Sequence, residues 1–317
     1  MLWLWIVLAV LAAGLACVAY GVLIERRWYR LERLRLDILP AGGEGSVPDT
    51  AGTRAAGPAG DAAITILHLS DLHYVRGDRK KTEFLASLPK ADLTVITGDI
   101  LGEPEAVETA VAALGPTRGR LASYVVLGSN DYFTPKPLNY FKYFRRHRGG
   151  RFTPPGRGGE LAARLEADGW EHLRNIRRDE EVGGRPIELV GLDDPHIGWH
   201  DLRVAPRRSP ERFGLAVVHS PDAAPELAAL GYDLILAGHT HGGQVRMPFV
   251  GALVTNCSLP PRLASGLIRF GDTLLYTSQG LGTSKFAPFR FLCRPEATVL
   301  ELRPARATRS PAPTRTG

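Results

Sequence analysis

The amino-acid sequence predicts an α/β or α+β domain with covered sheets, preceded by one apolar helix. Seven short runs rich in Val, Ile and Leu are too short for helices and are typical of buried strands. Helix-like stretches lie between them, at 103–114, 160–168 and 223–230. The strand-like runs are 64–69, 93–97, 124–127, 187–192, 215–218, 234–237 and 274–277. Strands that are apolar on both faces favour sheets covered by helices.

The composition is that of an ordinary globular chain in which Lys and Arg outnumber Asp and Glu. Of its 317 residues, 44% are hydrophobic and 23% are charged. The formal charge of +6 favours attraction to polyanions such as nucleic acid, anionic lipid or a phosphorylated substrate. Three cysteines are too few and too scattered for a disulfide framework or a zinc ribbon. We therefore expect free thiols in a reducing compartment.

Residues 1–24 contain no charged side chain and are long enough to cross a membrane as a helix. Because no basic segment precedes this run, we expect an uncleaved single-pass anchor in the cell membrane rather than a cleaved signal peptide. Five arginines follow within residues 26–35 and predict that the rest of the chain is cytoplasmic. Residues 25–40, a connecting segment, also alternate in part like an edge strand, which gives these arginines an alternative role within the fold.

Two segments have no apolar periodicity and are rich in Gly, Ala, Pro or Thr. Residues 41–62 are expected to form a flexible loop, and residues 304–317 a disordered tail. The remaining residues, 63–303, are expected to form the domain.

Polar side chains follow five of the predicted strands at the point where each strand ends. In α/β sheets the carboxyl edge is where functional sites are built. A single Asp in such a place is commonly a turn residue, but turn chemistry does not call for the four histidines found here. The residues are Asp71 and His73, then Asp99, then Asn130 and Asp131, then His219, then His239 and His241. Mixed Asp, Asn and His ligands suit Mn, Fe or Zn, and one shared carboxylate can bridge two ions that activate water and clamp a phosphate.

The order of these motifs resembles that of the calcineurin-like metallophosphoesterase superfamily. The motifs are D-x-H at 71–73, G-D at 98–99, G-S-N-D at 128–131, a lone His219 and G-H-T-H at 238–241, within a region from about 62 to 300. The stretches GHTHGGQ and QGLGTSKFAPFRFLCRPE resemble its membrane-associated branch, which includes UDP-2,3-diacylglucosamine pyrophosphatase-like proteins. The resemblance implies a two-sheet β-sandwich flanked by helices, with metals in loops at the strand ends.

The resemblance also implies a ligand set for two divalent ions, Mn²⁺, Fe²⁺ or Zn²⁺. Asp71, His73, Asp99 and His241 would hold the first ion. Asp99 would bridge to the second, which Asn130, His219 and His239 would complete.

One motif departs from the family, which usually has Gly-Asn-His followed by Asp or Glu where this chain has Gly-Ser-Asn-Asp. Either Asn130 remains a ligand through a shifted loop, with Asp131 near the place of the usual histidine, or Ser129 replaces the ligand. We favour Asn130, since an amide oxygen is the better ligand, and expect Asn130 and Asp131 to be catalytic. The missing histidine would protonate the leaving group, so its loss matters least for good leaving groups. His196 and His200 are possible substitutes and equally fit plain surface histidines.

The segment 132–157 carries seven Lys or Arg and seven aromatic residues but no acid. It predicts a cap over the metals that contacts anionic lipid headgroups, with single-stranded nucleic acid or a solvated loop as alternatives. Arg145, Arg146 and Arg290 are the expected substrate-binding residues.

Together these observations predict a membrane-anchored binuclear metal-dependent phosphohydrolase. Metal-activated water would cleave a phosphodiester or pyrophosphate bond in an anionic, lipid-linked or nucleotide-containing substrate. The membrane is an expected partner, nucleic acid is not, and no protein partner is inferred. The alternatives are a phosphodiesterase acting on soluble nucleotides or nucleic acid, and a metal-bound scaffold of low activity.

Overall fold

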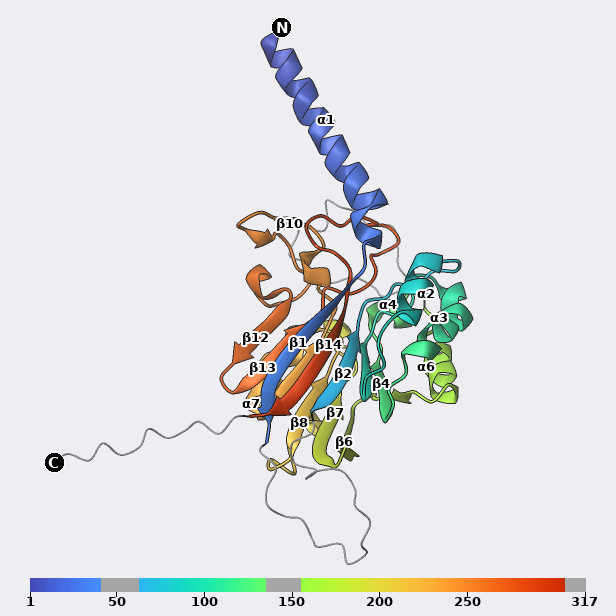
Figure 1. The fold of residues 1–317 in the computed structure, drawn as a ribbon, viewed down its shortest axis with the longest axis vertical. Helices are drawn as coiled ribbons and strands as arrows, with labels where there is room; N and C mark the ends of the chain where they lie inside the picture. Colours follow the sequence, from blue (N-terminus) through green and yellow to red (C-terminus); the bar gives the residue numbers. More distant parts are fainter. Residues whose placement is uncertain (41–62, 135–154, 306–317) are drawn as a thin grey trace, which may run out of the picture.

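The computed structural model describes residues 1–40, 63–134 and 155–305. Two six-stranded sheets pack face to face, and helices cover their outer faces (Figure 1). The first sheet has the order β1-β14-β2-β3-β4-β5, and the second the order β12-β13-β9-β8-β7-β6. The predicted mixed α/β class and the two-sheet architecture are confirmed.

In the first sheet, four parallel strands follow one another in sequence order. They are β2 (Ile64–Leu69), β3 (Leu93–Thr97), β4 (Ala122–Val126) and β5 (Glu171–His172). β14 (Glu296–Pro304) runs antiparallel to β2, and β1 (Arg30–Leu39) lies parallel to β14 at the edge. The outer face packs against α2 (Arg79–Ala86), α3 (Val107–Leu114) and α6 (Gly158–Ala167).

In the second sheet, the four central strands are also parallel. They are β13 (Thr273–Thr277), β9 (Leu234–Ala237), β8 (Phe213–Val217) and β7 (Arg185–Gly191). β12 (Gly266–Phe270) and β6 (Ile176–Val182) complete the edges in antiparallel pairing, and α7 (Ala224–Ala229) covers the outer face. All seven predicted strand runs and all three predicted helical stretches are confirmed as elements.

Smaller elements occupy the connections. A hairpin of β10 (Arg246–Met247) and β11 (Gly251–Ala252) stands apart from both sheets, and α4 (Ser129–Tyr132) is a single turn after β4. The 3-10 helices are η1 (Glu25–Arg27), η2 (Pro104–Ala106), η3 (Gly115–Thr117), η4 (Pro195–Ile197), η5 (Leu202–Val204), η6 (Pro221–Ala223), η7 (His241–Gly243) and η8 (Pro261–Leu263).

The main core lies between the sheets. Ile66 and Val95 on one sheet meet Leu215 and Leu236 on the other, and all four are buried. The short central strands are buried on both faces because helices cover the outer side, which explains why they read as continuous apolar runs. This packing fixes the carboxyl ends of β2, β3, β4, β8 and β9, from which the site is built.

The apolar helix α1 (Leu2–Leu23) projects away from the domain (Figure 1). Only Gly21 of this helix is buried, so its apolar side chains are exposed along its length. Twenty-two residues span about 33 Å at the helical rise, close to the thickness of a bilayer core. Helix α1 is therefore long and apolar enough to cross a membrane.

The foot of α1 is joined tightly to the loop before β14. The buried carboxylate of Glu25 accepts hydrogen bonds from the backbone amides of Leu292 (3.0 Å) and Cys293 (2.5 Å). A side chain at Gly21 would collide with Phe289 and the backbone of Arg290, so glycine permits this close approach. The direction of α1 relative to the domain is consequently fixed.

Strand β1 accounts for the alternation noticed in residues 25–40. Arg30 pairs with Glu296 (2.7 Å) and Arg35 with Glu301 (3.1 Å), both on β14. Leu36 and Leu39 reach the main core. Three of the five arginines after α1 thus lie on an edge strand. Strands β1, β6 and β12 were not among the seven predicted runs, because their surface positions interrupt the apolar sequence. Strand β14 was not among them either, because charged residues such as Glu296 and Glu301 interrupt its apolar sequence although most of its residues are buried.

We expect β1 to be integral to the domain. Deleting residues 1–40 would expose β14 and remove two buried leucines, each worth about 1.5–3 kcal/mol. Deleting residues 1–19 would remove only exposed residues. Thermal unfolding followed by circular dichroism should give a midpoint lower by more than about 5 °C for the longer deletion. Equal midpoints for the two chains would contradict this role.

Candidate metal centre

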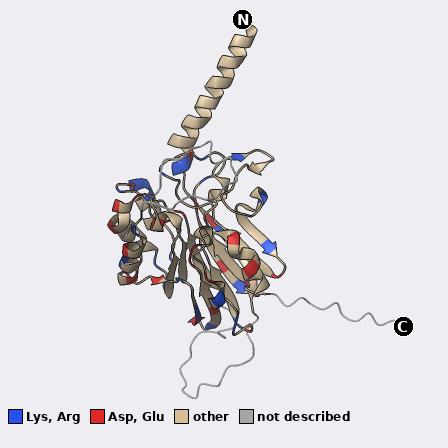
Figure 2. Cartoon of the chain, turned by 180° about the vertical axis from the view of Figure 1, so that it is seen from behind, with Lys and Arg blue, Asp and Glu red and all other residues tan. Residues whose placement is uncertain are grey.

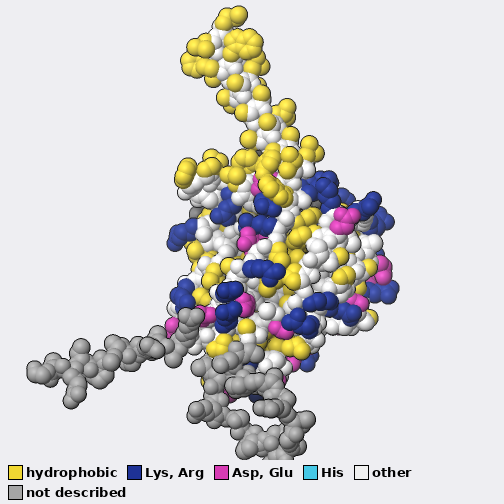
Figure 3. Space-filling view, viewed as in Figure 1, with side chains coloured by type: hydrophobic (Ala, Val, Ile, Leu, Met, Phe, Trp, Pro, Cys, Tyr) yellow, Lys and Arg dark blue, Asp and Glu magenta, His cyan; other side chains and the backbone are white. Residues whose placement is uncertain are grey.

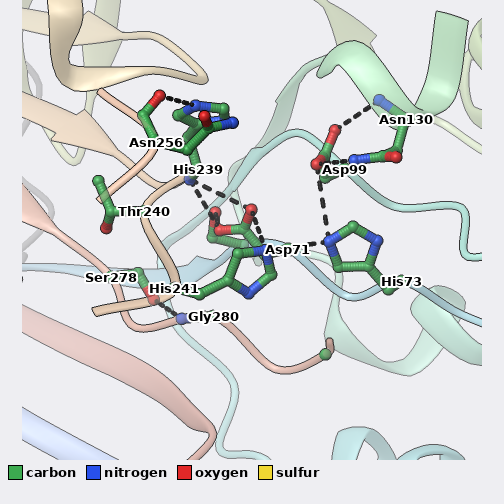
Figure 4. Close-up of polar contacts among 12 residues, drawn as sticks. Asp71, His73, Asp99, Asn130, His239, Thr240, His241, Asn256, Ser278 and Gly280 are labelled. Atoms are coloured by element: carbon green, nitrogen blue, oxygen red, sulfur yellow. Dashed lines mark hydrogen bonds and ion pairs between the residues drawn. The ribbon is translucent and has the colours of Figure 1, made fainter. Parts of the chain in front are cut away.

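The seven predicted metal-ligating residues converge at the carboxyl ends of strands from both sheets. Asp71 and His73 follow β2, Asp99 follows β3, and Asn130 lies in α4 directly after β4. His219 follows β8, whereas His239 and His241 follow β9. Figure 4 shows the side chains of six of them, together with their neighbours, around a common centre.

The loops that carry these residues have an unusual backbone. Asp71, His73, Asp99, His239 and His241 all have φ between 41° and 68°, in the left-handed region that non-glycine residues rarely adopt. Such strain persists only where the surrounding structure enforces it, and it concentrates at functional sites. At Gly238 a side chain would collide with Ser70 and Asp71, so the G-H-T-H glycine lets β9 approach β2.

Four side chains form the first group of donors: Asp71, His73, Asp99 and His241 each offer one atom within 4.8 Å of the others. The Nε2 atoms of His73 and His241 are 3.1 Å apart. His241 Nε2 lies 3.6 Å from Asp71 Oδ1, and His73 Nε2 lies 3.6 Å from Asp99 Oδ2.

A second group adjoins it on the other side of Asp99. His219 Nε2 lies 3.4 Å from Asp99 Oδ1 and 3.2 Å from His239 Nδ1. The backbone amide of Asn130 donates to Asp99 Oδ1 (2.8 Å), and its side-chain nitrogen donates to Oδ2 (2.5 Å). A half-turn of the amide would present its oxygen instead. This position supports Asn130, rather than Ser129, as the ligand from this loop.

Outer contacts fix which ring nitrogen of His219 and of His239 faces the centre. His219 Nδ1 contacts the carbonyl of Thr97 (2.6 Å), and His239 Nε2 contacts that of Asn256 (3.0 Å). The hydroxyl of Ser70 donates to Asp71 Oδ2 (2.6 Å). Metal-ligating histidines usually direct their second nitrogen to such a partner, which sets the tautomer.

The electrostatics of the group favour a cation at its centre. Burial, with Asp99 nearby, raises the pKa of Asp71 to about 6. Burial lowers the pKa of His73 to about 4 and that of His239 to about 3, so both rings are neutral and can act as ligands. Burial opposes protonation of His219, but Asp99, Asp194 and Asp71 outweigh it and raise its pKa to about 9. Without a metal, a proton on His219 partly balances the buried carboxylates.

The donor set fits a divalent metal ion. The buried His73 and the partly buried His241 point their Nε2 atoms at each other, an arrangement in which at most one can donate a hydrogen bond. Two buried carboxylates lie beside them. Asp, Asn and imidazole ligands together suit Mn, Fe or Zn.

Two predicted site residues have other roles in the structure. Asp131 is buried, and its carboxylate accepts from the backbone amides of Leu101 (2.8 Å) and Gly128 (3.0 Å). Because it clamps the loop, we replace the expected catalytic role with a positioning role. The buried guanidinium of Arg290 donates to the carbonyls of Gln279 (2.8 Å) and Gly282 (2.7 Å) and lies 3.4 Å from His241 Nδ1. It orients protein groups, so we no longer expect it to contact substrate. Arg145 and Arg146 lie outside the described residues.

The site also includes His196, which the sequence analysis named, and three groups that it did not single out, from Ser70, Thr97 and Asn256. The ring of His196 lies 4.3 Å from that of His239, which places one of the two proposed substitutes for the missing histidine beside the site. Ser70 directly precedes the D-x-H motif, and this position in the sequence could have identified it as a residue of the site. The contacts made by the backbone carbonyl groups of Thr97 and Asn256 could not be predicted from the sequence, because every residue has a backbone carbonyl.

A cavity of about 740 Å³ opens over the metal centre. His73, Asp99, Asn130, His239 and His241 form its polar floor. Its other walls are largely apolar and include Val18 and Val22 of α1, Leu253, Val254 and Phe289. The centre therefore faces the foot of α1.

We expect a divalent ion to stabilise the fold through Asp99. Mn²⁺ at a hundredfold excess over its dissociation constant should add about 2.7 kcal/mol to the unfolding free energy and raise the thermal midpoint. An Asp99→Ala chain should be less stable without metal, because His219, His73 and Asn130 outweigh the effect of burial and lower the pKa of Asp99, which stabilises its carboxylate in the fold. It should also lose this rise. The exposed Asp179→Ala serves as the control. A full rise in Asp99→Ala would contradict the assignment.

Comparison with known proteins agrees with this geometry. The pattern of the calcineurin-like phosphoesterase family matches residues 64–243. The chain is 31% identical to the uncharacterized metallophosphoesterase YkuE of Bacillus subtilis, over 78% of this chain and 81% of that protein. It is 37% identical to the phosphodiesterase YaeI of Escherichia coli, over 76% and 83% of the two chains.

A further relative is the UDP-2,3-diacylglucosamine pyrophosphatase LpxG of Chlamydia muridarum, which is 25% identical over 75% of this chain and 83% of its own. The family match covers more than half of the chain and includes all seven residues of the centre. Two sheets in the expected arrangement carry these residues at their strand ends, and the Asp and His cluster could bind a metal. The chain belongs to the calcineurin-like metallophosphoesterase family, whose members are hydrolases of phosphoester bonds.

Proposed function

We propose that this protein is a membrane-anchored, binuclear metal-dependent phosphohydrolase. It cleaves a phosphodiester or pyrophosphate bond in a lipid-linked or nucleotide-containing substrate. Asp71, His73, Asp99 and His241 hold one ion, whereas Asp99, Asn130, His219 and His239 hold the other.

The position of Asp99 is the observation that carries this proposal. Its Oδ1 atom faces His219 (3.4 Å) and its Oδ2 atom faces His73 (3.6 Å), so one carboxylate serves both groups of donors. Divalent ions held in such a pair lower the pKa of water and neutralise the charge of a phosphate. The backbone amide of Asn130 holds the Asp99 carboxylate in place with a hydrogen bond to Oδ1 (2.8 Å).

The surroundings of the cavity support a lipid-linked substrate. Val18, Val22 and Phe289 line the cavity whose floor is the metal centre. Apolar walls favour acyl chains over the sugar and base of a free nucleotide. Two relatives, named as a phosphodiesterase and a UDP-2,3-diacylglucosamine pyrophosphatase, support the bond types.

The location follows from α1. We propose that α1 anchors the protein in the cell membrane and that the domain lies on its cytoplasmic side. Arg26 and Arg27 follow the helix directly, and positive residues next to a span favour the cytoplasm.

The metal requirement gives the first test. After chelation, residues 21–317 should hydrolyse bis(p-nitrophenyl) phosphate only when Mn²⁺ is restored. Asp99→Ala should reduce turnover by more than about a hundredfold, because even outer-shell partners of a metal cost about 10–100-fold. Asp179→Ala should retain full activity. Metal-independent turnover, or normal turnover by Asp99→Ala, would refute the proposal.

The altered loop gives the second test. The double substitution Ser129→Asn with Asn130→His restores the usual family motif, including a general acid. We expect turnover of glycerophosphocholine, an alkyl diester with a poor leaving group, to rise by at least about tenfold. Turnover of bis(p-nitrophenyl) phosphate, whose leaving group needs no proton, should change by less than about threefold. Ser129→Asn alone is the control, and equal gains on both substrates would show that leaving-group protonation is not the difference.

A further inference from the structure

A second cavity, of about 580 Å³, adjoins the metal cavity on the side of α2. His73, Ser284 and Pro288 line both cavities and form the boundary between them. None of the other residues of the metal centre reaches this second cavity. It is therefore a separate space next to the place where a phosphate would be cleaved.

The second cavity is strongly cationic, and we call it the basic pocket. Its lining holds seven basic side chains and two acidic ones, Asp78 and Glu103, a surplus of five positive charges (seven minus two). The basic residues are Arg26, Arg27, Arg76, Arg79, Lys80, Lys81 and Lys285. Figure 3 shows Lys and Arg gathered beside the foot of α1, over the side where α2 lies.

Few of these charges are balanced within the described part of the chain. Lys81 pairs with Asp78 (3.1 Å), and Glu103 is shared between Arg76 and Lys285 (3.5 Å each). Four basic side chains of the pocket remain: Arg26, Arg27, Arg79 and Lys80. In residues 1–40, 63–134 and 155–305, no carboxylate forms an ion pair with any of them. The Nε atom of Arg26 is buried without a hydrogen-bond partner there. Crowded cations of this kind repel one another, and a bound anion relieves the repulsion.

The position of the basic pocket identifies the anion. Arg26 and Arg27 belong to η1, which directly follows α1, so one wall of the pocket is the foot of the apolar helix. Figure 2 shows Lys and Arg where α1 meets the domain. If α1 spans a bilayer, this level is that of the lipid headgroups, where phosphate is the common anion. Serine, threonine and glycine at 282–284 supply further polar groups on the inner wall.

We propose that the basic pocket is a second phosphate-binding subsite, which holds a phosphate group other than the one cleaved at the metal centre. The inference deepens, and rests on, the proposed phosphohydrolase function. The phosphate belongs either to the substrate itself, as in a pyrophosphate or a second ester, or to the headgroup of a neighbouring anionic lipid. In both cases the pocket aligns an anionic molecule that enters at the bilayer surface.

The test measures binding without metal or turnover. The full chain, metal-stripped in detergent micelles, is titrated with inorganic phosphate by calorimetry. We expect binding that weakens with salt, because exposed charges are screened beyond about 8 Å at physiological ionic strength. The double variant Arg79→Ala with Lys80→Ala, which removes two exposed side chains of the pocket, should weaken binding by at least about tenfold.

The control is the double variant Arg208→Ala with Arg269→Ala. It removes the same charge outside both cavities and should leave binding unchanged. Equal binding by the two double variants, or none by the unaltered chain, would overturn the proposal.

Competition distinguishes the two sources of phosphate. Phosphatidylglycerol added to the micelles should displace inorganic phosphate if the pocket takes a lipid headgroup, and ADP should do so if it takes a phosphate of the substrate. Displacement by either supports the subsite, and displacement by neither overturns it. Turnover of bis(p-nitrophenyl) phosphate by the Mn²⁺-loaded chain is measured separately, so failure of the subsite and failure of the proposed function give different results.

Discussion

The buried carboxylate of Asp99 is the constraint on which the rest of the site depends. It lies at the end of β3, where a left-handed backbone turns its two oxygens toward histidines from different sheets. Removing a carboxylate from water is costly unless its surroundings compensate, and here histidines and the amide groups of Asn130 do so. This arrangement requires the β-sandwich, because only the packing of two sheets brings the ends of β2, β3, β8 and β9 together.

The apolar helix α1 and the candidate metal centre belong to one continuous structure. Glu25 binds the backbone at Leu292 and Cys293, and Gly21 lies against Phe289 and Arg290 in the same loop. Arg290 in turn lies beside His241. The foot of α1 thus contributes to the wall of the metal cavity and also to the basic pocket. An amphiphile that leaves a bilayer along α1 would meet apolar walls, the metal centre and a cationic pocket within one short region.

Much of the architecture was predictable because the central strands are buried on both faces. Their apolar runs at 64–69, 93–97 and 234–237 match β2, β3 and β9 residue for residue. The edge strands β1, β6 and β12 carry charged side chains toward solvent, so their periodicity is weak. Ligand types were equally readable, since four histidines directly after strands have no role in turn chemistry.

The sequence by itself determined the family, the strand ends that carry the predicted metal-ligating residues, and the apolar helix, because each depends on residue type and local order. Tertiary structure decided what depends on direction and distance. It turned Asp131 toward the amides of Leu101 and Gly128, buried Arg290 among carbonyl groups, and brought His196 to His239. It also gathered Arg26 and Lys285, which are far apart in the chain, into one cationic cavity. Side-chain orientation and long-range proximity arise only when the two sheets pack, and no local pattern records them.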